Sequence, residues 1–342
     1  MQGITLIIPS HNRHLYLDRI LAYYRSTAIK ILVADSTELP YTPKETLENV
    51  TYLHIPGFTL TKKIPYVLSL VETPFVVMCA DDDFTTPEAI RQCVGFLLEN
   101  EDYTSALGNC ICYRKNSVNS GHVKFAAMYT DRLSYQFVAA DPFQRLKNFF
   151  QVYRTIFYAV HRTKVINDAF KGADKVITNL FLNEYNSAIL PVLKGKIAGL
   201  PFLMQVREFA ENSDDKTTIN LDAVFTDHEY SAAYQAFLDF EAPRMAEATG
   251  TDAETCRAKL DTILMDHAKY LLAQKNNEER DIIKRIGSNI ESIPVVGKKA
   301  IAIYRFLDRR RKLRRLVSTE SDRLNLAKIR KFINQYKDAV RT

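Results

Sequence analysis

Apolar residues in the first third of the chain follow two alternating patterns. Short continuous apolar runs, which predict buried strands, cover Ile4–Pro9, Ile29–Ala34, Val50–Ile55 and Pro74–Ala80. Apolar residues at helical spacing, which predict amphipathic helices, cover Leu15–Tyr24, Thr61–Val71 and Pro87–Glu99. Strands that alternate with helices are typical of a parallel sheet with helices on its faces. The pattern therefore predicts an α/β fold, doubly wound around a mostly parallel sheet.

The pattern changes in the rest of the chain. Alternating polar and apolar residues indicate strands in mixed or antiparallel pairing at Ser105–Tyr113 and Val123–Tyr129. Further elements are expected as a helix after Asp141-Pro142, a strand at Ile156–Val160, a helix at Ile177–Leu193 and a strand at Ile197–Val206. From about residue 226 the strand patterns stop, and Thr251-x-x-Glu254 resembles a helix capping box. We therefore expect a C-terminal helical appendage.

Three consecutive aspartates, Asp81, Asp82 and Asp83, follow the apolar run Pro74–Ala80 directly. The C-terminal ends of strands are the edge at which open α/β sheets bind ligands. Carboxylates this close raise each other's pKa unless a cation neutralises them. Hard oxygen ligands without neighbouring Cys or His suit Mg²⁺ or Mn²⁺, which complete their shells with phosphate oxygens and water. A charged helix start before Pro87-Glu88 explains one or two of these acids, but not three.

Polar residues also follow the first two predicted strands, as Ser10–Arg13 and as Asp35-Ser36. In a parallel sheet these strand ends converge with the aspartates on one edge. Asp35 can accept hydrogen bonds from a base or a ribose, and Arg13, Lys62 and Lys63 can supply positive charge to phosphates. Jointly these residues predict a site for a metal-bound nucleoside diphosphate.

Other classes of protein are disfavoured by what the sequence lacks. It has neither glycine-rich phosphate motif, Gly-x-Gly-x-x-Gly or Gly-x-x-x-x-Gly-Lys-Ser/Thr, which argues against dinucleotide oxidoreductases and P-loop NTPases. The five cysteines contain no Cys-x-x-Cys pair, so we expect reduced thiols in a cytoplasmic protein. Apolar runs are of strand length, far short of the roughly 20 residues of a membrane span.

Three of these segments resemble the motifs of one enzyme family. Ile4–Arg13 is an apolar strand followed by Pro-Ser-His-Asn-Arg, Val33–Ser36 reads Val-Ala-Asp-Ser, and Thr73–Asp83 ends in the aspartates. Their order and spacing resemble bacterial family 2-type glycosyltransferases, in a subgroup with a triple-Asp metal motif. The resemblance is specific over about residues 3–100, looser to about 215 and absent beyond. It implies the GT-A fold, a nucleoside diphosphate-sugar donor, a divalent cation and an inverting displacement.

The resemblance also assigns roles to single residues. It implies that Asp81 and Asp83 hold the metal. Donor binding is assigned to Pro9, Ser10, Asn12, Arg13, Asp35, Lys62, Lys63, Asp81, Asp82 and Arg207. We expect residues 1–115 to form the nucleotide-sugar half of the GT-A domain and residues 116–225 its acceptor half. Residues 226–342 are expected to form a helical region, because the strand patterns stop at about residue 226.

The acceptor half departs from the family pattern of Glu-Asp at a helix start. Glu184 is the matching carboxylate, with Asn183 or Tyr185 in the neighbouring place. We therefore expect Glu184 to deprotonate the acceptor hydroxyl. Asp174, in a glycine-containing loop, and Glu208, at a strand end, are the alternatives.

Positive charge is concentrated in the C-terminal region, in a chain whose net charge is +6. Over Lys298–Val317 an apolar stripe is surrounded by lysines and arginines. Such a helix can lie on an anionic membrane or pack on the catalytic domain with its basic face in solvent. Nucleic acid is disfavoured, because no aromatic residues interleave the basic run. We expect residues from about 230 onward not to be needed for the nucleotide site.

The sequence thus predicts a cytoplasmic glycosyltransferase, peripheral at the inner face of the membrane. It would move a sugar from a nucleoside diphosphate to a glycan or lipid-linked acceptor in bacterial surface polysaccharide synthesis. One alternative is a sugar-nucleotide nucleotidyltransferase, which needs a glycine- and arginine-rich loop where His11–His14 has no glycine. A degenerate nucleotide-binding relative without turnover is another.

Overall fold

The protein is described by a computed structural model over residues 3–44, 47–114, 123–128, 136–209, 227–286 and 311–336. In these ranges ten strands form one sheet, in the order β3-β2-β1-β4-β9-β6-β10-β5, with β7 beside β6 and β8 beside β10. The strands are β1 (Ile4–Ser10), β2 (Lys30–Asp35), β3 (Val50–His54), β4 (Phe75–Met78), β5 (Phe84–Thr85), β6 (Tyr103–Arg114), β7 (Phe125–Ala127), β8 (Gln136–Phe137), β9 (Val160–Arg162) and β10 (Lys196–Phe209).

The sheet is parallel in its two main parts. Strands β3, β2, β1 and β4 run parallel, and so do β6 and β10. Between these parts, β9 pairs antiparallel with both β4 and β6. Antiparallel pairing also joins β7 to β6, and β5 and β8 to β10. The prediction of an α/β fold with a mostly parallel sheet is therefore confirmed.

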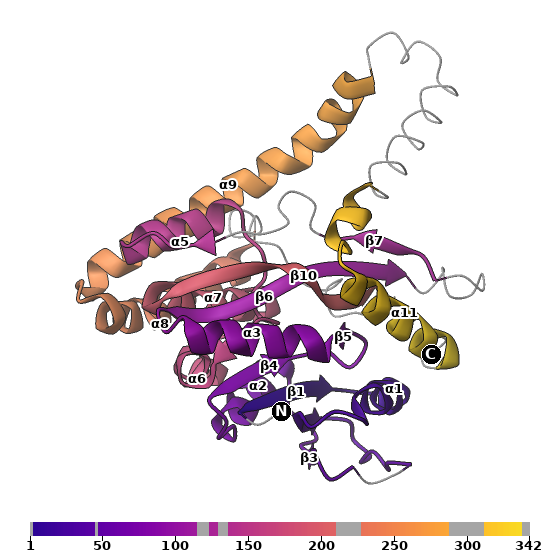
Figure 1. Cartoon of the computed structure of the whole chain (residues 1–342). Helices are drawn as coiled ribbons and strands as arrows, with labels where there is room; N and C mark the ends of the chain where they lie inside the picture. Colours follow the sequence, from indigo (N-terminus) through magenta and orange to yellow (C-terminus); the bar gives the residue numbers. More distant parts are fainter. Residues whose placement is uncertain are drawn as a thin grey trace.

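Helices cover the sheet. They are α1 (His14–Tyr24), α2 (Leu60–Ser69), α3 (Pro87–Glu99), α5 (Pro142–Gln151), α6 (Thr163–Phe170), α7 (Leu180–Lys194), α8 (His228–Thr249), α9 (Ala253–Ile286) and α11 (Glu320–Gln335), with a 3₁₀ turn η1 at Ala173–Lys175. Strands β1 and β6 point toward the side of the molecule where α11 lies, and α6 and α8 lie on the opposite side (Figure 1).

Helix caps explain where several helices begin. Thr86 and Asp141 each accept a backbone N–H of the first turn and are followed by proline, as is favoured at helix starts. The expected capping box at Thr251 is wrong by one residue, because Asp252 accepts the N–H of Thr255. An aspartate is as good a cap as a threonine, and the two were adjacent in sequence.

The strand expected at Ile156–Val160 is also wrong for most of its length. Ala159 donates its N–H to the carbonyl of Ile156 in a turn, and the strand begins only at Val160. Ile156, Ala159 and Val160 are all fully buried. Burial of a short apolar run therefore did not require a strand there.

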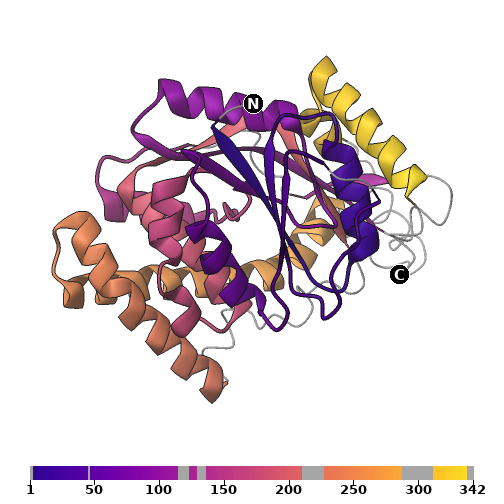
Figure 2. The same ribbon diagram turned by 90° about the horizontal axis from the view of Figure 1, so that it is seen from below.

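The C-terminal helices belong to the packed body of the protein. Helix α8 packs on α7 and α9, α9 packs on α5, and α11 packs on α1. Figure 2 shows α11, in yellow, beside the indigo α1. Leu316 and Val317, from the end of the predicted basic helix, are buried in the core, and Lys298–Arg310 lie outside the described residues. No described helix is long and apolar enough to cross a membrane.

Candidate functional site

The polar residues at the ends of β1, β2 and β4 meet at one edge of the sheet. Ser10 and Asp35 are paired in the register of β1 and β2. The Ser10 hydroxyl donates to Asp81 Oδ2 at 2.7 Å. The convergence expected from the parallel order of the strands therefore occurs, and the aspartates lie where the sheet presents its carboxyl ends.

Arg13 links the first two aspartates. Its Nη1 donates to Asp81 Oδ1 at 3.2 Å and to Asp82 Oδ2 at 2.8 Å. Both carboxylates are buried. Burial, followed by the charge of Asp82, raises the pKa of Asp81 to about 7, and burial also raises the pKa of Asp82. The carboxylates are thus held in a place that disfavours negative charge unless a cation is near.

Asp83 points to different partners, which all come from β10. Its Oδ1 accepts the backbone N–H of Glu208 at 2.9 Å, and its Oδ2 lies 3.2 Å from Arg207 Nε and 3.3 Å from Gln205 Nε2. Burial raises the pKa of Asp83 to about 8. Arg207, one of the residues expected to bind the donor, is therefore at this edge.

A buried arginine lies beneath the aspartates. Arg19 of α1 is fully buried and donates to the carbonyl of Asp82 at 2.6 Å and to Glu208 Oε2 at 2.9 Å. Glu208 also accepts from the hydroxyls of Tyr16 and Tyr113. With three donors on its two oxygens and 5% exposure, Glu208 is tied into the structure. These contacts support a role in fixing the site rather than in taking a proton.

Sequence reasoning missed Arg19, Tyr16 and Tyr113. A signal was present, because Tyr16 and Arg19 are three positions apart on the helix face that carries Leu17 and Ile20 toward the core. An arginine on such a face is rarely fully buried unless it is paired. Its acceptor Glu208 is 189 positions away, so the pairing could not be inferred from local pattern.

Asp35 is buried at the end of β2 and accepts four hydrogen bonds. Its Oδ1 receives the N–H and hydroxyl of Thr37, and its Oδ2 receives His14 Nε2 at 2.9 Å and the Tyr52 hydroxyl at 3.0 Å. Burial acts to raise its pKa, but these hydrogen bonds outweigh burial and hold the pKa below its usual value. Asp35 is therefore an ionised group that orders His14 and Tyr52 around it.

The remaining predicted donor residues divide into two groups. Lys63 is 3% exposed and donates its Nζ to the carbonyl of Ser10, whereas Lys62 is exposed on α2. Pro9 precedes Ser10 in β1, and Asn12 adopts a left-handed conformation with φ of 56° while its N–H bonds the Thr37 hydroxyl. A non-glycine residue in this region marks a turn fixed by its surroundings.

The two acids proposed as bases lie in different places. Glu184, near the start of α7, accepts the Tyr153 hydroxyl at 2.6 Å. Burial raises the pKa of Tyr158. The charge of Arg207 acts to lower this pKa, and the charges of Asp83, Glu184 and Asp82 act to raise it. The Arg207 guanidinium, a partner of Asp83, lies 5.1 Å from the centre of the Tyr158 ring.

Asp174 lies in a separate cavity of about 710 Å³ between α6, η1, α7 and α8. Leu190 and Lys194 line this cavity, and at 1.5 Å per residue they are about 9 and 15 Å along α7 from Glu184. Lys171, Lys175 and Arg244 surround Asp174 there. The lining of this cavity includes neither Glu184 nor any of the three aspartates.

The donor set at the aspartates fits a hard divalent cation bound together with phosphate. Within the described ranges, no three His, Cys, Asp or Glu side chains form a metal cage by themselves. Mg²⁺ usually takes only one or two carboxylates and completes its shell with phosphates and water. A carboxylate accepts about four hydrogen bonds, and the two from Ser10 and Arg13 leave capacity on Asp81. The neighbouring Cys79 thiol, whose pKa burial raises to about 12, is no competing ligand.

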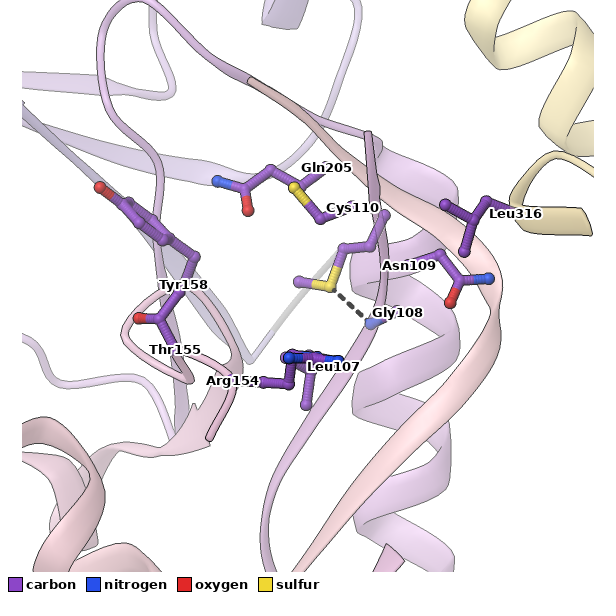
Figure 3. A pocket seen from close by; sticks show the side chains of 10 residues that line it. Leu107, Gly108, Asn109, Cys110, Arg154, Thr155, Tyr158, Gln205 and Leu316 are labelled. Carbon is purple, nitrogen blue, oxygen red and sulfur yellow. Dashed lines mark hydrogen bonds between the residues drawn. The ribbon is translucent and has the colours of Figure 1, made fainter. Parts of the chain in front are cut away.

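A small cavity adjoins this network (Figure 3). It has a volume of about 30 Å³, and Gln205, a partner of Asp83, lies in its wall. The lining residues are Leu107, Gly108, Asn109, Cys110, Arg154, Thr155, Tyr158, Met204, Gln205 and Leu316. Leu316, from the C-terminal segment, is also part of this wall. The expectation that residues from about 230 onward are not needed for the nucleotide site stays a prediction.

Comparison with known proteins gives a fold-level match. No family model matches the sequence, and no curated protein matches it. The structure of S. aureus TarS 1–349 in complex with UDP-GlcNAc is similar, with a TM-score of 0.52, 13% identity, and coverage of 100% of this chain and 91% of that chain. Another structure of TarS 1–349 has a TM-score of 0.47, 14% identity and the same coverage. The similarity to the UDP-GlcNAc complex shows that this chain has the fold of TarS.

Proposed function

We propose that this protein is a metal-dependent, inverting glycosyltransferase that uses a nucleoside diphosphate-sugar donor. The observation that carries the proposal is the cluster of polar residues at the carboxyl edge of the sheet. Ser10 and Arg13 bind Asp81 and Asp82 there, Asp35 lies opposite Ser10 in the strand register, and Asp83 binds Arg207 of β10. The fold match supports it, because the similar TarS structure was crystallised with UDP-GlcNAc. UDP-sugars are therefore the first donors to test.

The nucleoside end of the donor is assigned to β2. Asp35 orders Tyr52 and His14, and His14 remains about one-third exposed, so the side chain can meet a ligand. The aspartates follow β4, the neighbour of β1 on its other side. A donor laid across these strand ends would place its nucleoside near Asp35 and its diphosphate near Arg13.

The diphosphate end is assigned to the arginines and aspartates. Asp81 and Asp83 would hold Mg²⁺ or Mn²⁺, which when bound supplies positive charge to the leaving diphosphate. Arg13 and Arg207 already lie against these carboxylates and can turn their donors to phosphate oxygens. Lys63 fixes the Ser10 carbonyl and so holds the turn that carries Arg13.

The proposed reaction is a single displacement at the anomeric carbon. Glu184 accepts the proton of an acceptor hydroxyl, whose oxygen forms the new bond to that carbon. The bond from the carbon to the diphosphate breaks, and its electron pair leaves with the diphosphate. Tyr153, hydrogen-bonded to Glu184, orients the carboxylate. The acceptor class is a glycan or a lipid-linked saccharide.

We further propose that electrostatic attraction brings the enzyme to an anionic membrane. Residues 311–336 contain eight lysines and arginines and two acids, so their net charge equals the +6 of the whole chain. Arg311, Arg314 and Arg315 are exposed, whereas Leu316 and Val317 face the core. Attachment through this segment would thus rely on charge rather than on insertion. In a vesicle flotation experiment, binding that does not depend on acidic lipid or on the salt concentration would contradict this proposal.

A panel of nucleotide sugars, tested with and without Mn²⁺ or Mg²⁺, is the first experiment. A ligand at 100 times its Kd stabilises the folded state by about 2.7 kcal/mol and raises the melting temperature. We expect at least one UDP-sugar to do so only with the cation, and to be hydrolysed slowly without an acceptor. Binding without hydrolysis or transfer would favour a degenerate relative. Release of pyrophosphate from a nucleoside triphosphate and a sugar phosphate would favour a nucleotidyltransferase.

A further inference from the structure

Strand β10 carries a bulge just before it reaches Asp83. In its ladder with β6, Leu203 is opposite Asn109 and Gln205 is opposite Cys110, so Met204 is an extra residue. Bulges next to active sites re-aim the side chains that follow them. Here the residues that follow are Gln205, Arg207 and Glu208, whose side chains or backbone N–H contact Asp83.

The polar groups of the bulge are held by Thr86 and by Gly108 of β6. Thr86 donates its N–H to the Met204 carbonyl at 2.8 Å and its hydroxyl to the Leu203 carbonyl at 3.1 Å. Gly108 donates its N–H to Met204 Sδ (Figure 3). A Cβ at Gly108 would lie 2.6 Å from the Phe202 carbonyl oxygen. The bulge is therefore tightly enclosed, and Thr86 joins it to the segment that contains the aspartates.

The N–H of Leu203 is bound by a residue near the far end of the chain. Asp322 of α11 accepts it through Oδ1 at 2.7 Å, although the two residues are 119 positions apart. Asp322 is 2% exposed. Its other oxygen, Oδ2, accepts the N–H of Thr319 at 3.1 Å in a capping box. One carboxylate thus caps α11 with one oxygen and binds the bulge with the other.

We propose that Asp322 is a positioning residue of the donor site and that the C-terminal segment is part of that site. By satisfying the Leu203 N–H, Asp322 holds the β10 bulge in register and so presents Arg207, Gln205 and the Glu208 N–H to Asp83. Leu316, in the wall of the cavity beside Gln205, adds a second contact from the same segment. The proposal rests on the proposed function only in naming the ligand that the site binds.

The two oxygens allow the two roles to be separated by substitution. Asp322→Ala removes both acceptors. Asp322→Asn keeps an oxygen for Leu203 but presents an amide, which cannot accept, to Thr319. Thr319→Val removes the reciprocal cap from the Asp322 N–H and leaves the bond to Leu203. A residue that merely caps α11 would make Thr319→Val and Asp322→Asn behave like Asp322→Ala.

Hydrogen exchange of the full chain, read by mass spectrometry, tests the positioning without any ligand. In Asp322→Ala we expect faster exchange in peptides that cover residues 203–208 and 80–86, because the bulge loses a fixed partner. In Thr319→Val and Asp322→Asn both peptides should exchange as in the wild type. Unchanged exchange at 80–86 in Asp322→Ala, or equal effects in all three variants, would overturn the proposal.

Binding of UDP with Mn²⁺, measured by calorimetry on the same proteins, gives the functional readout. Loss of a charge-assisted hydrogen bond corresponds to an increase in Kd of about tenfold or more. We expect Asp322→Ala to weaken UDP binding about tenfold, and Thr319→Val and Asp322→Asn to change it less than about twofold. UDP binding unaltered in Asp322→Ala contradicts the positioning role. If the wild type binds no nucleotide, the proposed function fails, while the exchange experiment still decides the role of Asp322.

Discussion

The first and last of the three aspartates are held by partners of different origin. Asp81 is held by Ser10 and Arg13, from the turn that follows the first strand. Asp83 is held by β10, from residues 122 to 125 positions later. Burial raises the pKa of both. The comparison teaches that one half of the site is built within a compact N-terminal unit, and the other half depends on the return of the chain.

Substitution of Asp83 should have the largest effect. Asp83→Asn keeps the size of the side chain but removes the charge that would hold the metal and that binds Arg207. We expect turnover to fall by about three orders of magnitude or more, as when a group that stabilises the transition state is removed. The turnover of Asp81→Asn should fall by a similar factor if the two halves of the site contribute equally. Turnover is measured at saturating donor with Mn²⁺.

A surface aspartate provides the control for this pair. Asp102 is mostly exposed and pairs with Lys196. Asp102→Asn should leave turnover within about twofold, because exposed ion pairs contribute little. Full activity of Asp83→Asn in the presence of a chelator would remove the metal assignment from both halves.

The proposed proton acceptor, Glu184, should show the next largest effect. Glu184→Gln is expected to lower turnover by about two to four orders of magnitude while the Kd for donor barely moves. Asp174→Asn serves as the matched substitution and should have little effect, because Asp174 lies in the separate cavity near the end of α7. The opposite outcome, with Asp174→Asn inactive and Glu184→Gln active, would assign the chemistry to the loop.

The sequence predicted the N-terminal half of the site better than the other half. Ser10, Asp35 and the aspartates were located because parallel strands bring their carboxyl ends to one edge. Lys62 and Lys63 could not be separated, since adjacent residues of a helix point in different directions and only the structure shows which one is buried. Arg207 was expected to touch the leaving diphosphate, and the structure places it at this edge, against Asp83.

What the sequence could not supply were pairings between distant buried groups. Arg19 with Glu208, and Leu203 with Asp322, join residues 189 and 119 positions apart. Neither pair produces a local pattern, because hydrophobic periodicity reports which face is buried and not which polar groups meet there. The contact between α11 and β10 was missed for the same reason.

Asp35 offers a smaller effect, confined to the N-terminal half. Asp35→Asn removes the negative charge that accepts from Thr37, Tyr52 and His14. We expect binding of UDP and of the intact UDP-sugar to weaken by similar factors of about ten, since both carry the nucleoside. Free UDP that binds unchanged would show that Asp35 does not serve the nucleoside.

The smallest effect concerns stability, and it contrasts two buried glutamates. Glu208 accepts hydrogen bonds from three side chains, whereas neither oxygen of Glu241 has a hydrogen-bond partner among the described residues, and Arg244 is 3.6 Å away. Burial raises the pKa of Glu241 to about 7, although the charge of Arg244 acts to lower it.

The direction of the pH effect follows from that shift. Because the pKa of Glu241 in the folded protein is above its usual 4.5, its contribution to stability is fully present below that value and is lost as the pH rises through about 7. Between about pH 5 and pH 8, the melting temperature of Glu241→Gln should therefore fall less than that of the wild type. Identical pH profiles of the melting temperature in the two proteins would show that the Glu241 carboxylate has a hydrogen-bond or ionic partner in solution.

The most direct test of the account is the binding of Mn²⁺, followed by electron paramagnetic resonance in the presence and absence of UDP. The account predicts that UDP strengthens Mn²⁺ binding in the wild type, because a diphosphate completes the shell that Asp81 and Asp83 begin. Asp83→Asn should abolish this gain, and Asp102→Asn should retain it. Equal Mn²⁺ binding in wild type and Asp83→Asn, with or without UDP, would contradict the assignment of this sheet edge as a metal–diphosphate site.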